Sequence, residues 1–271
     1  KIVVLAKQVP DTRNVGKDAM TPEGTVNRAA LPAIFNPEDL NALEAALSIK
    51  DQAEGSTVHI LTMGPPRAAD IIRDAMFRGA DGGYLLTDRK FAGSDTLATS
   101  YALSCALRKI RPDLIVAGRQ AIDGDTAQVG PQVAEKLNLP QVTYAEQIVE
   151  LKDNAIVIKR RLEHGTEVVE CPLPMVMTVN SSAPDCRPRN ARRVMKYKFA
   201  LTPSEIAAQP DSAYAGYAAG KPYLQIVEWS AADVEPDENV VFQAKESKCL
   251  TCTDGEIEEL MVELIASHTL G

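Results

Sequence analysis

Long apolar runs, histidine and positive charge are all scarce in this sequence. No apolar run approaches the roughly 18 residues that a membrane-spanning helix needs, so we expect no membrane span. The chain has only 3 His, which is too few to favour a His-based metal site or a catalytic triad. Its 29 Lys and Arg are outnumbered by 37 Asp and Glu. The resulting net charge of −8 argues against nucleic acid as a main partner.

Cysteine is sparse and odd in number. Five Cys in 271 residues fit the reduced thiols of a cytoplasmic protein better than a disulfide framework. Cys249 and Cys252 form a single C-x-x-C pair, and one pair does not supply the four ligands of a tetrahedral metal site. The opening run from Lys1 to Ala6 is too short for a signal peptide, and Asp11 follows it closely. We therefore expect a cytoplasmic protein without a metal site.

Short apolar runs alternate with helical patterns through the first part of the chain. Hydrophobic residues make up 45% of the sequence, which is enough for a packed core. The runs predict strands over residues 2–6, 57–63, 84–87, 113–118 and 174–179. Apolar periodicity predicts helices after Asn36, where Asn36 suits the N-cap and Pro37 the first turn, and over 65–78, 94–110, 126–137 and 256–264. This alternation predicts an α/β fold with a parallel sheet flanked by helices.

Two later regions depart from that alternation. Residues 147–151, 155–161 and 166–170 alternate apolar and polar, with turn residues between them, and predict an antiparallel hairpin excursion. After residue 182 the periodic pattern fades. Ile226, Trp229 and other apolar residues there are too many for a plain disordered tail, and they favour an extended C-terminal arm packed on another protein. We expect a nucleotide-binding α/β domain over 1–182, then a recognition loop and C-terminal arm over 183–271.

The loop after the fourth predicted strand carries the chemistry. The sequence has neither a Walker A motif nor G-x-G-x-x-G, so the loop is neither a P-loop nor a standard Rossmann fingerprint. Yet a buried strand ends at Gly118, a polar loop follows, and a helix begins near Thr126. Ligands of open parallel sheets lie outside the carboxyl ends of the strands, where the N–H groups of a following helix suit phosphate. An ordinary strand-to-helix loop with a good cap is the alternative reading.

Several side chains of this loop suit a nucleotide, and other predicted strand ends should face it. Gly118 and Gly124 allow the backbone to approach a ligand closely. Thr126 and Gln128 would donate to phosphate or ribose, whereas Asp123 and Asp125 would accept from ribose or cap the helix. The ends of three further segments are expected at the same edge of the sheet, at Ala6, Asn36 and Met63. Converging strand ends and helix starts predict an adenine-nucleotide cleft.

Several motifs together resemble the β subunits of electron transfer flavoproteins. They are KIVVLAKQVPDT at 1–12, FNPEDLNALEAAL at 35–47, MGP at 63–65, AMFRGAD at 75–81, GRQAIDGDTAQVGPQ at 118–132 and LPMVMTVNSSAPDCRPR at 173–189. The resemblance implies a heterodimer in which an α subunit carries one FAD and the β subunit holds either AMP or a second FAD. The cofactor-binding residues that it implies are Ala6, Asn36, Met63, Gly118, Arg119, Gln120, Ala121, Ile122, Asp123, Gly124, Asp125, Thr126, Ala127, Gln128 and Val129.

The nucleotide in the cleft decides which function the resemblance implies. Members that hold AMP carry electrons from acyl-CoA dehydrogenases to a quinone reductase. Members that hold FAD take a hydride from NADH and bifurcate the electrons, one to ferredoxin or flavodoxin and one through the α-subunit flavin to a partner dehydrogenase. The segment IDGDTAQVGP at 122–131 resembles the FAD type, and Gly124 leaves room beside a pyrophosphate. We therefore expect FAD, with AMP as the alternative and a regulatory adenine-nucleotide-binding module as a second alternative.

Two basic features complete the resemblance. A flavin supplies its own redox chemistry, so no catalytic acid or base is assigned, and Arg119 would either tune the flavin or form a structural ion pair. Residues 185–198 resemble the recognition loop that docks on the partner dehydrogenase. Related proteins often place a Leu there, whereas this chain has Ala191, Arg192 and Arg193. The alternatives for this segment are a solvated basic face and arginines held on the α subunit.

Overall fold

The computed structural model describes residues 1–11, 32–208 and 226–234. Its centre is a nine-stranded sheet with the order β11-β5-β4-β1-β6-β10-β7-β8-β9. The strands are β1 (Ile2–Leu5), β4 (Val58–Met63), β5 (Gly82–Leu86), β6 (Leu114–Gly118), β7 (Gln141–Leu151), β8 (Ala155–Leu162), β9 (Gly165–Pro172), β10 (Met175–Val179) and β11 (Val227–Trp229). A separate antiparallel pair joins β2 (Gln8–Pro10) to β3 (Ala33–Phe35). The five strands expected from apolar runs are confirmed as β1, β4, β5, β6 and β10.

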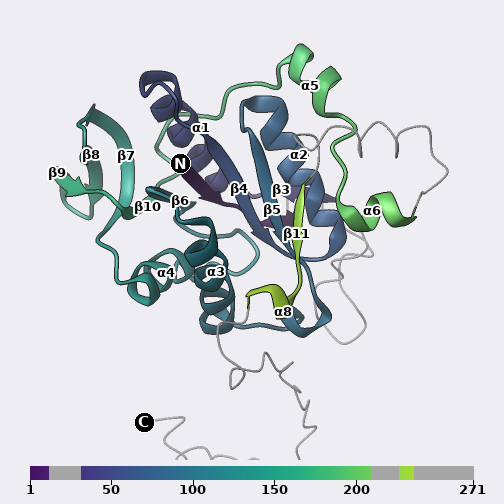
Figure 1. Cartoon of the computed structure of the whole chain (residues 1–271). Coiled ribbons are helices and arrows are strands. Elements are labelled where there is room, and N and C mark those ends of the chain that lie inside the picture. The colour runs from purple at the N-terminus through teal and green to yellow at the C-terminus, as the bar shows by residue number, and fades with distance from the viewer. Residues whose placement is uncertain (12–31, 209–225, 235–271) are drawn as a thin grey trace, which may run out of the picture.

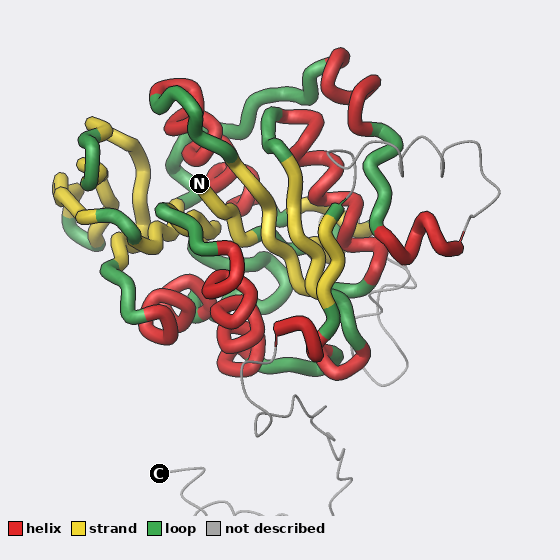
Figure 2. Tube along the Cα trace, viewed as in Figure 1, coloured by secondary structure: helices red, strands yellow, loops and turns green. Residues whose placement is uncertain are grey.

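Helices cover both faces of the parallel part of the sheet (Figures 1 and 2). They are α1 (Pro37–Gln52), α2 (Ala69–Arg78), α3 (Thr96–Ile110), α4 (Val129–Leu137), α5 (Ala191–Tyr197), α6 (Pro203–Ala208) and α8 (Ala231–Val234), with short 3-10 turns η1 (Pro66–Ala68) and η2 (Arg89–Phe91). Among these helices of the described ranges, none is long and apolar enough to cross a bilayer.

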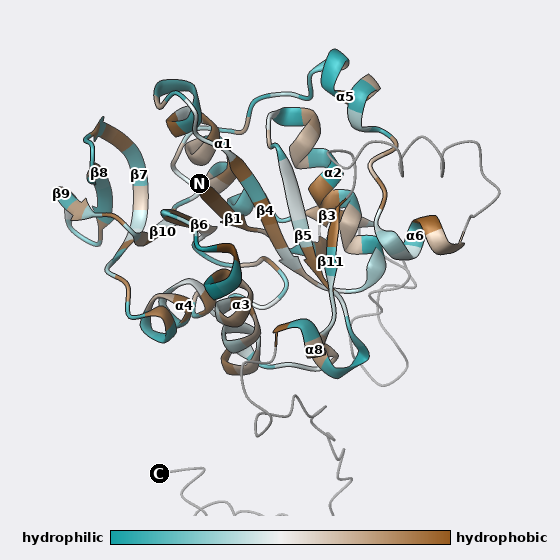
Figure 3. Cartoon of the chain, in the orientation of Figure 1, coloured by the Kyte–Doolittle hydropathy of each residue, from teal (hydrophilic) through white to brown (hydrophobic). Residues whose placement is uncertain are grey.

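Successive side chains of β1 point to opposite faces of the sheet, so this strand contributes to two apolar clusters. Ile2 and Val4 belong to the apolar cluster beneath α1 and α2, while Val3 and Leu5 belong to the cluster beneath α3 and α4. All four are buried, as expected of a strand covered on both faces. Figure 3 accordingly shows hydrophobic colour along the central strands β1 and β4.

The predicted antiparallel excursion is confirmed and is an extension of the same sheet. β7 pairs in parallel with β10 near its start and antiparallel with β8 farther along, and β8 pairs antiparallel with β9. The fold is therefore α/β, with a largely parallel sheet that ends in an antiparallel meander.

Two helix boundaries differ from the sequence prediction. The helix expected over 126–137 begins only at Val129, because Asp125 and Ala127 adopt left-handed backbone conformations with φ of 49° and 52°. The helix expected over 65–78 is divided into η1 and α2. Asn36 holds the N-cap position of α1, but its side chain forms no capping hydrogen bond and has other partners.

Part of the predicted C-terminal arm lies on this chain's own sheet. β11 pairs in parallel with β5, Ile226 is fully buried, and Trp229 lies 5.0 Å from the ring of Tyr84. The apolar character of Ile226 and Trp229 is therefore explained within the chain. The predicted helix over 256–264, like Cys249 and Cys252, lies outside the described residues.

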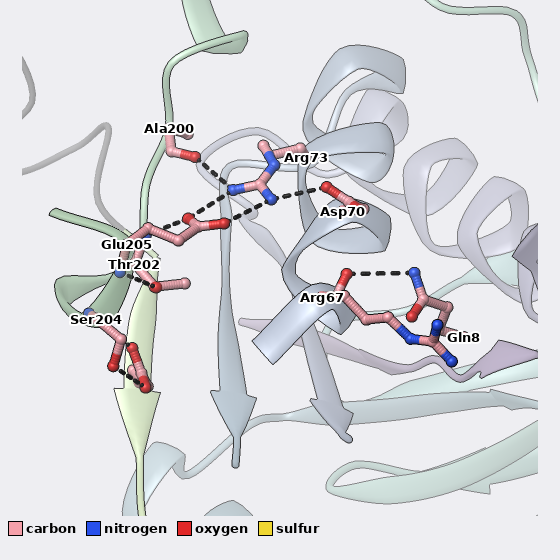
Figure 4. Close-up of polar contacts among 9 residues, drawn as sticks. Gln8, Arg67, Asp70, Arg73, Ala200, Thr202, Ser204 and Glu205 are labelled. Atoms are coloured by element: carbon pink, nitrogen blue, oxygen red, sulfur yellow. Dashed lines mark hydrogen bonds and ion pairs between the residues drawn. The ribbon is translucent and has the colours of Figure 1, made fainter. Parts of the chain in front are cut away.

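Polar contacts fasten the segment before β11 to α2. Arg73 donates to the carbonyl of Ala200 at 3.0 Å and pairs with Glu205 at 2.9 Å (Figure 4). Ser204 in turn donates to Glu228 of β11 at 2.6 Å. These bonds join α2, α6 and β11 at one side of the sheet.

Candidate functional site

A cavity of about 470 Å³ opens at the carboxyl ends of β1, β4 and β6. The chain first adds β4 and β5 on one side of β1 and then crosses to β6 on the other, so the strand order reverses beside β1. The register aligns Leu5 with Leu61 and Ala117, which brings the three strand ends to one edge. Such a switch point is where doubly wound sheets bind ligands, and the volume lies in the usual range of about 300–1,000 Å³ for ligand pockets.

Main-chain N–H groups without a hydrogen-bond partner occur in one stretch of this cavity's lining, within the part of the chain that the structure describes. Among the hydrogen bonds of the described residues, none uses the N–H of residues 126–130, all of which line the cavity. Val129 and Gly130 open α4, where the helix dipole adds partial positive charge. Pro131 follows without a donor, which costs little in the first turn of a helix. Consecutive free N–H groups at a helix start fit a phosphate.

The start of the same loop is held by residues at the start of α1 that do not line the cavity. Asn36, which is fully buried, donates to the carbonyl of Gln120 at 2.9 Å and accepts the N–H of Ile122 at 3.1 Å. Glu38 accepts the N–H of Gln120 at 3.0 Å and pairs with Arg119 at 3.0 Å. The structural ion pair considered for Arg119 is thus present, and hydrogen bonding to Glu38 raises the pKa of Arg119. Arg119 nevertheless also lines the cavity.

Asp39 joins the ends of the two central strands. Its carboxyl accepts the N–H of Lys7, just after β1, at 2.8 Å and the N–H of Gly118, at the end of β6, at 3.2 Å. Burial raises the pKa of this carboxyl from 3.8 to about 7, although both N–H donors act in the opposite direction. The site therefore contains an acid that titrates near neutral pH.

Side-chain contacts also cross the cavity. Lys7 pairs with Asp123 at 2.7 Å, which links the end of β1 to the loop. Thr96, at the start of α3, donates to Gln128 at 2.8 Å. The cleft is therefore bounded by the loop on one side and by the start of α3 on the other.

Of the predicted cofactor-binding residues, all but Asn36 and Ile122 line the cavity. The thirteen that do are Ala6, Met63, Gly118, Arg119, Gln120, Ala121, Asp123, Gly124, Asp125, Thr126, Ala127, Gln128 and Val129. Asn36 contacts the main chain of the loop, so it supports the cleft from behind.

Gly118 has a structural role that was not expected, and one expected capping role is wrong. A Cβ on Gly118 would lie 2.4 Å from Oδ1 of Asp39, so this glycine permits the close approach of β6 to α1 and not only that of a ligand. Neither Asp123 nor Asp125 caps α4, because the helix begins at Val129 and no side chain caps it. At Gly124, by contrast, a Cβ would meet nothing within 4 Å, which leaves the room that a ligand requires.

Two walls of the cleft were not predicted from the sequence. One wall comes from the β2–β3 pair and the other from the turn into α3. The missed residues include Gln8, Val9, Pro10, Ala33, Ser94, Asp95 and Thr96. The motif KQVP at 7–10 contributed only to the family resemblance. Asp95, whose side chain caps α3 by accepting the N–H of Ala98, was a local signal that could have located the second wall.

The basic segment 185–198 is partly fixed to its own chain. Arg187 pairs with Glu44 at 2.9 Å, and Arg193 donates to the carbonyl of Met76 at the end of α2 at 2.6 Å. Both arginines are therefore held by this chain's own helices. Met195 of α5 is 67% exposed, so an exposed apolar residue exists here that the family resemblance did not identify.

Comparison with known proteins agrees with the geometry. Residues 23–202 match the model of the electron transfer flavoprotein domain. A caffeyl-CoA reductase-Etf complex subunit, CarD, of Acetobacterium woodii is 51% identical over 179 residues, covering 66% of this chain and 67% of the relative. An electron transfer flavoprotein subunit beta of Megasphaera elsdenii is 44% identical over 215 residues, covering 77% of this chain and 78% of the relative.

A third relative carries a different description. The acryloyl-CoA reductase electron transfer subunit gamma of Anaerotignum propionicum is 50% identical over 181 residues, which is 66% of each chain. The match thus spans about two thirds of the length of this relative and of CarD. The family match and these identities lead to one assignment: the chain belongs to the electron transfer flavoprotein family and is similar to its β subunits.

Proposed function

We propose that this chain is the β subunit of a heterodimeric electron transfer flavoprotein that holds FAD in the cleft at the ends of β1, β4 and β6. In this proposal it takes a hydride from NADH in the cytoplasm. One electron then goes to ferredoxin or flavodoxin, and the other passes through the α-subunit FAD to a partner dehydrogenase. The observation that carries the proposal is the row of free N–H groups at 126–130 beside a cavity of about 470 Å³.

The lining residues indicate which tasks belong to the chain and which belong to the bound flavin. When bound, the flavin supplies hydride acceptance and single-electron transfer, while the chain sets its position and surroundings. The N–H groups of residues 126–130 would bind phosphate, and Asp125, on the same loop, would accept from a ribose hydroxyl. Lys7 contributes a positive charge at the cleft that Asp123 balances. Arg119 is balanced by Glu38 in the same way, so its effect on a flavin would be moderated by that pair.

The extent of the cleft favours FAD over AMP. Besides the loop, the cavity is lined by Met63, by Phe91 and by Thr96 at the start of α3. This second wall offers apolar and polar surface for the other half of a dinucleotide, which AMP lacks. The alternative is an AMP-holding carrier between acyl-CoA dehydrogenases and a quinone reductase.

The names of two relatives support a partner that acts on acyl-CoA. One is described as part of a caffeyl-CoA reductase-Etf complex and another as an electron transfer subunit of acryloyl-CoA reductase. We infer a flavin dehydrogenase or reductase of acyl-CoA thioesters as the partner of this chain. The exposed part of segment 185–198, which includes Met195, is the surface proposed to dock on it.

Counting the nucleotides tests this function. The chain is co-expressed with the α subunit, the heterodimer is purified, and FAD and AMP are quantified after heat release. We expect two FAD and no AMP per heterodimer, and NADH should bleach both flavins. One FAD and one AMP would establish the alternative carrier, whereas failure to bind any α subunit would favour a regulatory nucleotide-binding module.

A further inference from the structure

The first turn of α1 directs its side chains away from its own helix. Residues at a helix start commonly accept N–H groups of that same helix, yet Asn36 forms no such cap. Asn36, Glu38 and Asp39 accept the N–H groups of Ile122, Gln120 and Gly118, respectively. The helix and the loop therefore meet in antiparallel order, and the bonded N–H groups are those of every second loop residue.

The opposite side of this loop segment is held by the sheet. The N–H of Arg119 points the other way and donates to the carbonyl of Val179, the last residue of β10, at 2.9 Å. Successive N–H groups from 118 to 120 thus alternate between α1 and β10. Such a segment has little freedom, whereas the N–H groups of 126–130, a few residues farther on, are left for a ligand.

Burial makes these bonds costly to lose. Asn36, Glu38 and Asp39 are 0%, 8% and 6% exposed. The bond from Gly118 is buried, and those from Gln120 and Ile122 are partly buried. An N–H group that loses its acceptor away from water keeps the cost of its desolvation, so removal of one acceptor should free the segment to seek water. Neither Asn36 nor Glu38 lines the cavity, so their effect on a ligand would be indirect.

We propose that Asn36, Glu38 and Asp39 form a positioning clamp that holds residues 118–122 in place before a nucleotide arrives. The clamp rests on the proposed function, because it gives that function a preorganised loop. A loop that is fixed in advance loses less conformational freedom when a nucleotide binds. Residues that do not contact the nucleotide would therefore still affect its affinity.

A matched pair of variants isolates the clamp. Glu38→Ala removes the acceptor of the Gln120 N–H and the partner of Arg119. Glu44→Ala, on the same helix, removes the acceptor of the Arg187 N–H and the partner of the Arg187 guanidinium, away from the cleft. A general loss of helix or ion-pair stability would affect both variants alike. Only the clamp predicts a difference at the loop.

Two measurements are made on the full chain, co-expressed with the α subunit and stripped of nucleotide. Amide hydrogen exchange of residues 118–122 should accelerate about tenfold or more in Glu38→Ala and remain at the wild-type rate in Glu44→Ala. The Kd for each of two probes, AMP and FAD, should rise about tenfold in Glu38→Ala alone, as expected for one lost buried contact. Glu38→Gln, which keeps an acceptor for Gln120, should recover part of both effects.

The outcomes separate the clamp from the function. Equal exchange of 118–122 in the two variants would overturn the clamp, whether or not either probe binds. Faster exchange without a change in Kd would likewise overturn its positioning role. A wild-type chain that binds neither AMP nor FAD would instead refute the proposed function. Should Glu38→Ala not fold, Asn36→Ala supplies the same test, since its removal frees the N–H of Ile122.

Discussion

Two glutamates of α1 hold two distant segments with nearly the same chemistry. Glu38 accepts the N–H of Gln120 at 3.0 Å and pairs with the neighbouring Arg119. Glu44 accepts the N–H of Arg187 at 2.8 Å and pairs with the guanidinium of that same residue. One helix therefore fixes the loop of the cleft near its start and the basic segment farther along.

The two held segments differ in what they leave free. The cleft loop turns back beside a cavity and presents main-chain N–H groups there. The basic segment runs on to α5, where Met195 is exposed. Similar anchoring would thus support the proposed nucleotide site in one place and the proposed docking surface in the other. The two segments differ in the groups that they leave free and not in the way that α1 holds them.

The largest expected effect on stability comes from adding a side-chain carbon where β6 contacts α1. Gly118→Ala would place a Cβ 2.4 Å from Asp39 Oδ1 and 2.7 Å from the main chain of Glu38. We expect a loss of about 2–3 kcal/mol in the free energy of unfolding, measured by urea titration, because backbone must shift. Gly124→Ala, with nothing within 4 Å, is the control and should stay within about 0.5 kcal/mol. Equal losses would show that β6 does not depend on this contact.

Asp39 should give the cleft a pH dependence opposite in sign to that of the basic segment, where the pKa of Glu44 is lowered by its bonds to Arg187 although burial acts to raise it. Its folded pKa of about 7 exceeds the ordinary value of 3.8, so the folded state binds the proton more tightly. Its contribution to stability is complete below pH 3.8 and is lost as the pH rises through about 7, with a slope of up to about 1.4 kcal/mol per pH unit.

Asp39→Asn tests that sign. The variant should be less stable at acidic pH, because an amide offers one acceptor oxygen where the carboxyl offers two, but its stability should fall less between pH 4 and 7.5 than that of the wild type. Urea unfolding across this range measures the difference. Parallel curves for the two proteins would mean that Asp39 does not titrate in this window.

Release of the basic segment should cost less than disruption of the cleft. Arg187→Ala removes the pair with Glu44, and the Arg187 side chain is 32% exposed, so solvent screening reduces the loss. We expect a loss of about 1 kcal/mol in the free energy of unfolding and an unchanged Kd for AMP. A weaker affinity for AMP would show that the two segments held by α1 are coupled.

The smallest effect on stability is expected at Met195. Met195→Ala should change the free energy of unfolding by less than about 0.5 kcal/mol, because this side chain is 67% exposed. If segment 185–198 docks on the partner dehydrogenase, electron transfer to that partner should slow about fivefold, as expected from the loss of one interfacial apolar contact. Unchanged transfer would remove Met195 from the docking surface.

Much of the cleft could be predicted because short stretches of sequence indicate its strands and its loop. Apolar runs identified the buried strands, and the polar stretch after Gly118 identified the loop, since parallel strands end at one edge of a sheet. The start of α4 could not be placed, because it depends on left-handed conformations at Asp125 and Ala127 that non-glycine residues seldom adopt.

The roles of the supporting residues could not be predicted from local sequence. Asn36 carries the pattern of an N-cap, yet its partners Gln120 and Ile122 lie 84 and 86 residues away. Trp229 likewise suggested an arm packed on another protein, because the sequence does not show that β11 pairs with the distant strand β5 of the same chain. Only the folded topology brings such residues together.

The most direct test of the nucleotide cleft follows the amides of the loop. The ¹⁵N-labelled full chain, assembled with its α subunit and stripped of nucleotide, is titrated with AMP and then with FAD while amide resonances are recorded. We expect the largest shifts at the N–H groups of residues 126–130, and FAD should also shift those at the start of α3. Resonances of 126–130 that stay in place while either nucleotide binds would contradict the assignment of this cleft.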